Sequence, residues 1–382
     1  MISRCFPFAG AWRALSRCPH RYLKTVSRVK AKSVGIRDVA KLAGVSTASV
    51  SRALNVPATV RPEMRARIDA AARELGYIPD AAARALSSRK TRTIGAVIPT
   101  VDNAMFARGI EALQRHLSLK GYLLLLATSG YEPEVEFQQA QNMVSRGIDG
   151  LILRGDVHTE GLRTLLATQR IPFVNVGVYH PDKPYGCVGA DNELAAWRAC
   201  RHLIGLGHRH IGMVAALSHN NDRATARVRG VRRALAEAGM TLEDRWTVEV
   251  PYHLDDARQA ARALLVQPER PTALVCGNDV IAYGVLLEAE RRGLVVPRDI
   301  SVMGFDDLEW SRHLRPSLTT MHLPTDEVWT RAGEYLVNTL TGMPAVLHYE
   351  VEASLVVRES TGPAPFSRDE GTGRPAASRQ NP

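Results

Sequence analysis

Short apolar runs alternate with amphipathic stretches from about residue 94 to residue 357, a pattern typical of a parallel sheet covered by helices on both faces. Several amphipathic stretches are followed by a glycine, which commonly ends a helix. So long an alternation exceeds one ordinary doubly wound sheet and predicts two similar lobes with a cleft between them. The expected strands are 94–98, 122–127, 150–153, 173–176, 210–215, 272–276 and 300–303, and the expected helices include 111–119, 191–206, 225–238 and 280–292.

Before residue 94 the pattern changes to short helices rich in alanine and arginine. The segment 36–55, IRDVAKLAGVSTASVSRALN, has apolar residues at helical spacing on both sides of Gly44-Val45-Ser46. Gly44 can adopt a left-handed turn conformation, and Ser46 can cap a second helix. We therefore predict a helix-turn-helix, with an ordinary helical hairpin as the alternative.

A third helix follows, with Pro62 near its start, so three helices make up a small all-α unit. In a DNA-reading unit of this kind the second helix presents its first side chains to base edges in the major groove. The candidates here are Thr47, Ala48 and Ser49, and Arg52 one turn later can reach a guanine or a phosphate.

Charge alone does not identify the partner of this chain. Of the net charge of +10, eight cations fall in residues 1–35, which contain no acidic residue, so the remainder carries only about +2. Five widely spaced cysteines form no zinc or C-x-x-C pattern and are expected to be reduced thiols of a cytoplasmic protein. No run is apolar enough to span a membrane, and Arg13 and Arg17 interrupt any signal sequence.

The segment that follows the basic leader carries a specific resemblance. The positions D-V-A-x-x-A-G-V-S, V-S-R-x-L-N and L-G-Y-x-P, from Asp38 to Pro79, are similar to the headpiece of the lactose-repressor (LacI/GalR) family. The resemblance implies operator DNA as partner and extends the DNA-contacting set to Asn55. It also implies that residues 80–86 form the family's hinge helix, in which Ala83 and Leu86 contact the minor groove and Leu86 wedges between bases. A solvated alanine-rich linker is the alternative.

The later part of the chain, from residue 93 to about residue 362, resembles the same family's effector core, which is related to periplasmic sugar-binding proteins. The landmarks are C-G-N-D at 276–279, V-M-G-F-D-D at 302–307 and R-P-S-L-T-T at 315–320. Several of the matched side chains follow strand ends, where ligands bind in doubly wound folds. The resemblance implies an effector site made of Asn103, Phe106, Arg227, Tyr252, Asn278, Asp279 and Asp306.

Two observations bear on the effector. Gly177 stands where some sugar-binding relatives have an aspartate, so that sugar contact is missing. The stretch 129–134, SGYEPE, resembles gluconate-type repressors of the family, which makes a sugar acid an alternative to a neutral sugar. Asp279 has a second interpretation, in which it only caps its helix.

These features predict an all-α helix-turn-helix headpiece joined to a two-lobed α/β core of doubly wound parallel sheets. The expected function is a DNA-binding repressor, a homodimer controlled by a small molecule; a free transport-type sugar-binding protein and an enzyme are the weaker alternatives. No phosphate loop, dinucleotide fingerprint or nucleophile elbow appears, so we expect no catalytic residue, cofactor or metal. The expected segments are a disordered basic extension (1–33), headpiece (34–79), hinge and linker (80–92), core (93–362) and disordered tail (363–382).

The two ends of the chain bear on its origin and on its oligomeric state. The basic leader can alternatively be an organellar transit peptide or the product of a misassigned start codon. The tail from residue 363 onward contains no leucine, whereas tetramers of the lactose-repressor type need a leucine-repeat tail. We therefore expect a dimer.

Overall fold

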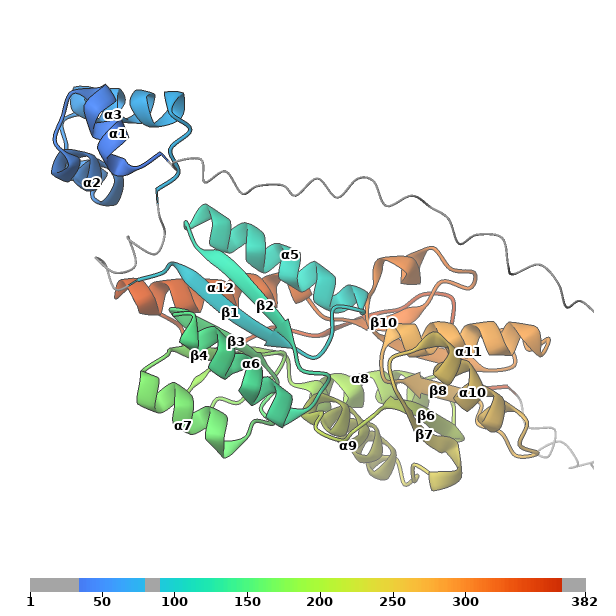
Figure 1. Cartoon of the computed structure of the whole chain (residues 1–382). Coiled ribbons are helices and arrows are strands. Elements are labelled where there is room, and N and C mark those ends of the chain that lie inside the picture. Colours follow the sequence, from blue (N-terminus) through green and yellow to red (C-terminus); the bar gives the residue numbers. More distant parts are fainter. Residues whose placement is uncertain (1–33, 80–89, 366–382) are drawn as a thin grey trace, which may run out of the picture. The chain divides into compact units, whose positions relative to one another are not determined.

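The computed structural model describes residues 34–79 and 90–365 (Figure 1). The chain divides into two compact units, residues 1–87 and 88–382, and we treat each by itself. The hinge residues Ala83 and Leu86 lie outside the described residues, as do the basic leader and most of the tail. No helix in the described ranges is long and apolar enough to cross a membrane.

The first unit is a bundle of three helices around a small apolar core. Its elements are α1 (Ile36–Ala43), α2 (Thr47–Asn55), a 3₁₀ turn at Pro57–Thr59, and α3 (Pro62–Glu74). Each helix contributes one completely buried aliphatic side chain, Val39, Val50 and Ile68 respectively. Buried alanines fill further positions of this core, and their small side chains let the helices approach closely.

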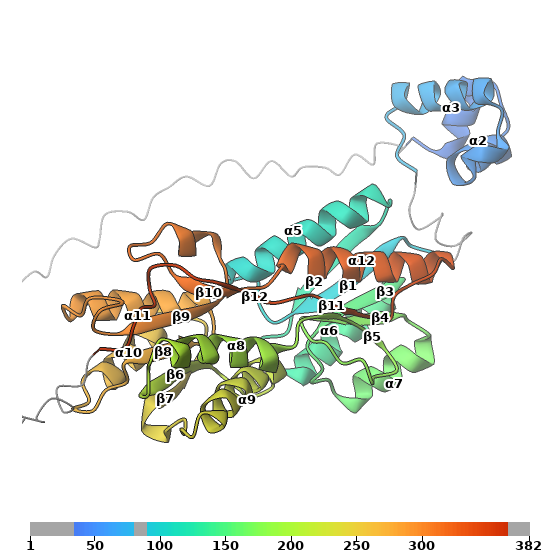
Figure 2. The ribbon, with the colours of Figure 1, turned by 180° about the vertical axis from the view of Figure 1, so that it is seen from behind.

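The second unit contains two six-stranded sheets, as the alternation predicted. The first lobe has the strand order β11-β5-β4-β3-β1-β2, with every neighbouring pair parallel. Helices α5 and α12 lie side by side on one face, while α6 and α7 cover the other (Figures 1 and 2). The bounds are β1 Thr93–Ile98, α5 Ala104–Leu119, β2 Leu123–Thr128, α6 Pro133–Ser145, β3 Gly150–Arg154, α7 Glu160–Gln169, β4 Phe173–Val176, β5 Gly186–Gly189, α12 Thr325–Thr341 and β11 His348–Glu350.

The second lobe repeats this design with the order β12-β10-β9-β8-β6-β7, in which only the edge pair β10 and β12 is antiparallel. Helices α8 and α9 cover one face, and α10 and α11 cover the other. The bounds are α8 Asn192–Gly205, β6 Ile211–Ala216, α9 Asp222–Glu237, β7 Thr247–Val250, α10 Leu254–Leu265, β8 Ala273–Cys276, α11 Asp279–Arg291, β9 Ser301–Asp306, β10 Thr319–His322 and β12 Ser354–Val356, with 3₁₀ turns at Asp244–Trp246 and Glu309–Arg312.

The chain crosses between the lobes three times: between β5 and α8, between β10 and α12, and between β11 and β12. The first lobe is therefore completed by α12 and β11, which follow most of the second lobe in the sequence. Each crossing is only a few residues long, so the crossings can act as a hinge about which the lobes open or close. In the view from behind, α12 runs along the first lobe while β10 and β12 belong to the second (Figure 2).

Candidate functional site

The turn between α1 and α2 is fixed by three local interactions. Gly44 has φ of 62°, a conformation that costs glycine little, and the Val45 amide donates to the Ala40 carbonyl at 3.0 Å. The Ser46 hydroxyl accepts from the Ser49 amide at 3.1 Å and caps α2 as predicted. Arg67 of α3 donates to the Ala43 carbonyl at 2.6 Å and so ties the turn to the third helix, a role that the sequence did not reveal.

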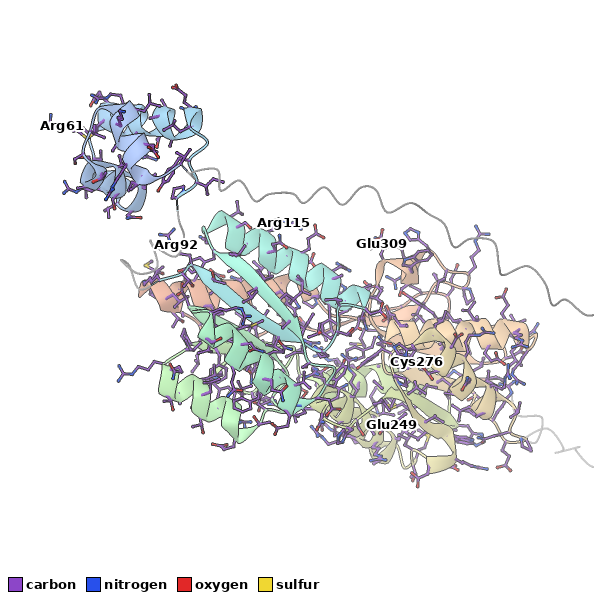
Figure 3. The ribbon with its side chains drawn as sticks, in the orientation of Figure 1. Arg61, Arg92, Arg115, Glu249, Cys276 and Glu309 are labelled. Atoms are coloured by element: carbon purple, nitrogen blue, oxygen red, sulfur yellow. The ribbon has the colours of Figure 1, made fainter. Side chains whose placement is uncertain are left out.

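One face of α2 is left open to solvent by this packing. Thr47, Ala48, Arg52 and Asn55 are exposed, and Ser49 is half-buried beneath them. Val50 and Ala53 point the other way, into the core of the unit. The structure thus gathers the five predicted α2 side chains on one outward side, with Arg61, exposed at the N-cap of α3, a further cation of the unit (Figure 3).

In the second unit, the centre of the predicted site is an arginine and an aspartate of the second lobe. The guanidinium of Arg227, on α9, lies 3.6 Å from the carboxylate of Asp306, the last residue of β9. The same guanidinium stacks on the Phe305 ring at 3.7 Å and donates to the Asn192 side chain at 3.1 Å and the Gly277 carbonyl at 2.6 Å. Arg227 is therefore held rigidly from three sides, independently of Asp306.

Asp306, unlike Arg227, has a strained backbone and an unsatisfied side-chain oxygen. Its φ is 110°, a region in which a side-chain-bearing residue is strained, and its Oδ1 atom is buried without a hydrogen bond. Burial raises the pKa of Asp306 to about 6, although the neighbouring Arg227 and Arg154 act to lower it. Strain and a missing hydrogen-bond donor at one buried carboxylate are typical of a binding site.

Asn278 and Asp279 follow β8, whose last residue, Cys276, is labelled in Figure 3. Asp279 accepts hydrogen bonds from the Thr320 and Ser311 hydroxyls, each at 2.6 Å, and from the Leu308 amide at 2.7 Å. Oδ2 thus holds the loop after Asp306 and Oδ1 holds β10, and burial followed by the Asp306 charge raises the pKa of Asp279 to about 7. Asn278, not Asp279, caps α11, and the buried Asn278 amide nitrogen has no partner.

The remaining predicted residues are Asn103 and Phe106 of the first lobe and Tyr252 of the second. Asn103 caps α5 by accepting from the Met105 amide at 3.1 Å, and Phe106 is buried behind a guanidinium centred 5.5 Å from its ring. That guanidinium belongs to Arg154, so Phe106 is covered from the cleft side. Tyr252 of the second lobe stacks with Tyr131 of the first at a centroid distance of 6.3 Å.

Sequence reasoning missed Arg154, Arg223 and Tyr131, which all reach this cleft. Arg154 ends β3 and Tyr131 comes shortly after β2, so both obey the rule that ligands bind beyond the carboxyl ends of strands. Arg223 is buried in the first turn of α9, four residues before Arg227. The signal for Arg154 was its place at the end of the expected strand 150–153.

The two lobes are closed on one another in this structure. The Asp156 amide of the first lobe donates to the Asp222 carboxylate of the second at 2.8 Å, and the Asn192 side chain donates to the Gly177 carbonyl at 2.9 Å. Two cavities that adjoin Arg154 have only about 20 Å³ each, room for one water molecule. A larger groove of about 520 Å³ opens beside Asp222 and Arg229. Arg223 also lines this groove, so a ligand larger than water can reach Arg223 in the closed arrangement but can reach Arg154 and Arg227 only when the lobes part.

Comparison with known proteins gives matches over both units. Residues 35–80 match the model for bacterial regulatory proteins of the lacI family, and residues 200–361 match that for a periplasmic binding protein-like domain. The chain is 34% identical to the HTH-type transcriptional repressor PurR of Salmonella paratyphi B over 334 residues, 87% of this chain and 98% of PurR.

Solved structures agree with these matches. A Lacl family transcriptional regulator from Silicibacter pomeroyi aligns with a TM-score of 0.77 at 27% identity, over 86% of this chain and 99% of that one. The Lac repressor dimer bound to operator and the anti-inducer ONPF aligns with a TM-score of 0.77 at 26% identity, over 87% of this chain and 100% of that one. These matches confirm the predicted fold class, a helix-turn-helix headpiece joined to a two-lobed α/β core.

Proposed function

The chain belongs to the LacI/GalR family of bacterial transcription regulators, and from this premise we propose that it is a repressor whose operator affinity is set by a small molecule bound in the cleft of its core. The observation that carries the proposal is the conjunction of two features in one chain. The first is a recognition helix with an open polar face, and the second is a hinged two-lobed core with buried, strained polar groups facing the cleft.

The DNA-reading part of the proposal rests on α2. Thr47, Ala48 and Arg52 contact base edges in the major groove, while Ser49 and Asn55 contribute from the same face. An exposed arginine one turn into the helix can donate two hydrogen bonds to one guanine, which gives sequence preference as well as affinity. Ala83 and Leu86 keep the minor-groove role expected from the sequence.

A homodimer on a pseudo-palindromic operator follows from the family's architecture, and both the dimer and its operator are part of the proposal. The Lac repressor structure named above is a dimer bound to operator. Two copies of one recognition helix, one per half-site, fit a duplex whose half-sites repeat with the same symmetry.

The regulatory part rests on the cleft. A sugar or sugar acid contacts Arg227 and Asp306, and Tyr252 covers it. Asn103, Phe106, Asn278 and Asp279 support the walls through the caps, packing and loop contacts described above. The ligand shifts operator affinity only by its different affinity for the open and closed arrangements of the lobes, with a coupling of about 1–3 kcal/mol. Residues 80–92 join the headpiece to β1, so the first lobe is the one that transmits the change.

The test begins by selecting a preferred duplex from a random pool with the full-length protein. We expect Arg52→Ala to weaken binding to that duplex by about 1–3 kcal/mol and to relax the preference at one base pair. Arg65→Ala, which removes an exposed cation from α3, is the matched control and should leave the base preference unchanged. The proposal is wrong if a protein lacking residues 34–79 still binds the selected duplex.

A further inference from the structure

Three arginines from both lobes converge on the centre of the cleft. Arg154 comes from the first lobe, at the end of β3, and Arg223 and Arg227 come from α9 of the second. They are close enough for the positive charges of Arg223 and Arg227, after burial itself, to lower the pKa of Arg154 to about 10. Like charges facing one another across a hinge oppose closure unless something neutralises them.

Two glycines make room for these guanidinium groups. A Cβ atom on Gly177 would clash with Nη1 of Arg154, and one on Gly155 would clash with Nη1 of Arg223. No side chain fits at either position while the arginines keep these places. The space beside Gly177 is therefore occupied by the guanidinium of Arg154.

The three cations are unequally neutralised. Arg223 has Asp222 at 2.6 Å, and Arg227 has Asp306 at 3.6 Å. Among the described residues no carboxylate lies within ion-pair distance of Arg154, whose remaining contacts are the Met105 sulfur at 3.9 Å and the Phe106 ring. The Nε atom of Arg154 is shielded from solvent and has no hydrogen-bond partner. Among these three cations Arg154 is therefore the one without an ion-pair partner in the described residues, and its Nε donor is unused.

We propose that the effector carries a carboxylate, which the guanidinium of Arg154 binds together with Arg223. This inference rests on the proposed function, because it names the ligand class of the same cleft. A planar guanidinium matches a carboxylate through two parallel hydrogen bonds. A carboxylate brings the single negative charge that pairs with Arg154, whereas a phosphate monoester brings almost two. The hydroxyl-bearing part of the ligand faces Ser129, Tyr131, Glu132 and Glu136, which line the cavity next to Arg154 and Arg223 and whose oxygens can accept hydrogen bonds from its hydroxyls.

The same contacts explain how this ligand can act on the lobes. Because Arg154 is on one lobe and Arg223 on the other, a carboxylate between them replaces a repulsion across the cleft by two attractions. It therefore binds the closed arrangement more tightly than the open one, which is the difference in affinity that regulation requires. Arg154 is in this sense the residue that selects the ligand class.

The experiment uses full-length wild type, Arg154→Gln and Arg115→Gln, the last removing a charge that is exposed on α5 (Figure 3). The probes are matched pairs: gluconate and glucitol, galactonate and galactitol, glucuronate and glucose, with glucose 6-phosphate as a dianion, all at equal ionic strength. Binding is measured by calorimetry and by the change in Tm. We expect an acid to bind wild type and Arg115→Gln equally, and its affinity to fall about 10- to 100-fold in Arg154→Gln.

Several outcomes overturn the proposal. These are equal binding of a neutral partner, unchanged acid affinity in Arg154→Gln, binding of the phosphate ester only, and no binding by any acid.

A measurement without ligand checks the premise that the charge of Arg154 has no ion-pair partner. The Tm of ligand-free Arg154→Gln should equal or exceed that of ligand-free wild type, and a clearly lower Tm refutes the premise. Binding of the selected duplex by ligand-free wild type is measured in parallel. Failure to bind that duplex both without ligand and with the acid would refute the proposed function, whereas acid binding by the core would still stand.

Discussion

Asp306→Asn should make the protein more stable at neutral pH while removing its response to effector. The pKa of Asp306 is raised from 3.8 to about 6, so the folded state holds this proton more tightly than the unfolded chain does. The stabilisation is therefore complete below about pH 4 and is lost as the pH rises through 6. At about 1.4 kcal/mol per pKa unit, the ionised carboxylate costs the fold about 3 kcal/mol at pH 8.

Asparagine keeps the shape of the side chain and cannot ionise. Arg227 retains its bonds to Asn192 and Gly277 when the carboxylate is gone, so the substitution does not strand the guanidinium. For a chain of this size the gain corresponds to a rise in Tm of roughly 6 °C at pH 8.

The measurement is the Tm of wild type and Asp306→Asn between pH 4.5 and 8.5, with and without the best carboxylate probe. Asp255→Asn, at a carboxylate that is 90% exposed on α10, controls for the loss of charge alone. The Tm difference between Asp306→Asn and wild type should grow as the pH rises to about 6.5 and then level off. A lower Tm for Asp306→Asn at pH 8, or a difference that does not change with pH, would refute the reasoning.

Two further predictions concern the DNA-binding part. Ser46→Ala removes the hydroxyl that accepts from the Ser49 amide, and it should destabilise the first unit by about 1 kcal/mol, measured as faster hydrogen exchange of the α2 amides; unchanged exchange would mean that the cap contributes nothing. Deleting residues 1–32 removes eight cations without a sequence-reading element, so operator affinity should fall uniformly and depend less on salt. Loss of binding to one operator with others unaffected would contradict this.

The sequence predicted the elements whose signal is local. The strand at 173–176 was placed with its true bounds because three of its four residues are apolar and it is flanked by Pro172 and Gly177. In contrast, β5 was missed because two of its four residues are glycines, and β11 and β12 are three-residue edge strands. Their pairing is decided by partners more than a hundred residues away for β11 and more than thirty for β12, which no short window of sequence contains.

In the candidate site, too, the residues in local motifs were predicted and those whose role depends on distant parts of the chain were not. Arg227 and Asp306 were identified from matched motifs, and the structure brings them within 3.6 Å of each other. Arg154 could not be recognised as part of the site from its neighbours, because its importance depends on Gly177 and Arg223, which come from other strands and the other lobe. Gly177 was noted as a missing contact, but a sequence does not show which side chain takes the vacated space.

The order of strands also determines when the first lobe can be completed during synthesis on the ribosome. Its sheet lacks the β11 edge, and its α5 face lacks the cover of α12, until residues 325–350 have emerged. At about 5–20 residues per second, the interval after β5 is on the order of ten seconds. Throughout that interval a nascent chain exposes apolar side chains of α5 that α12 later buries. Premature termination within the second lobe should therefore give an aggregation-prone fragment and not a working half-protein.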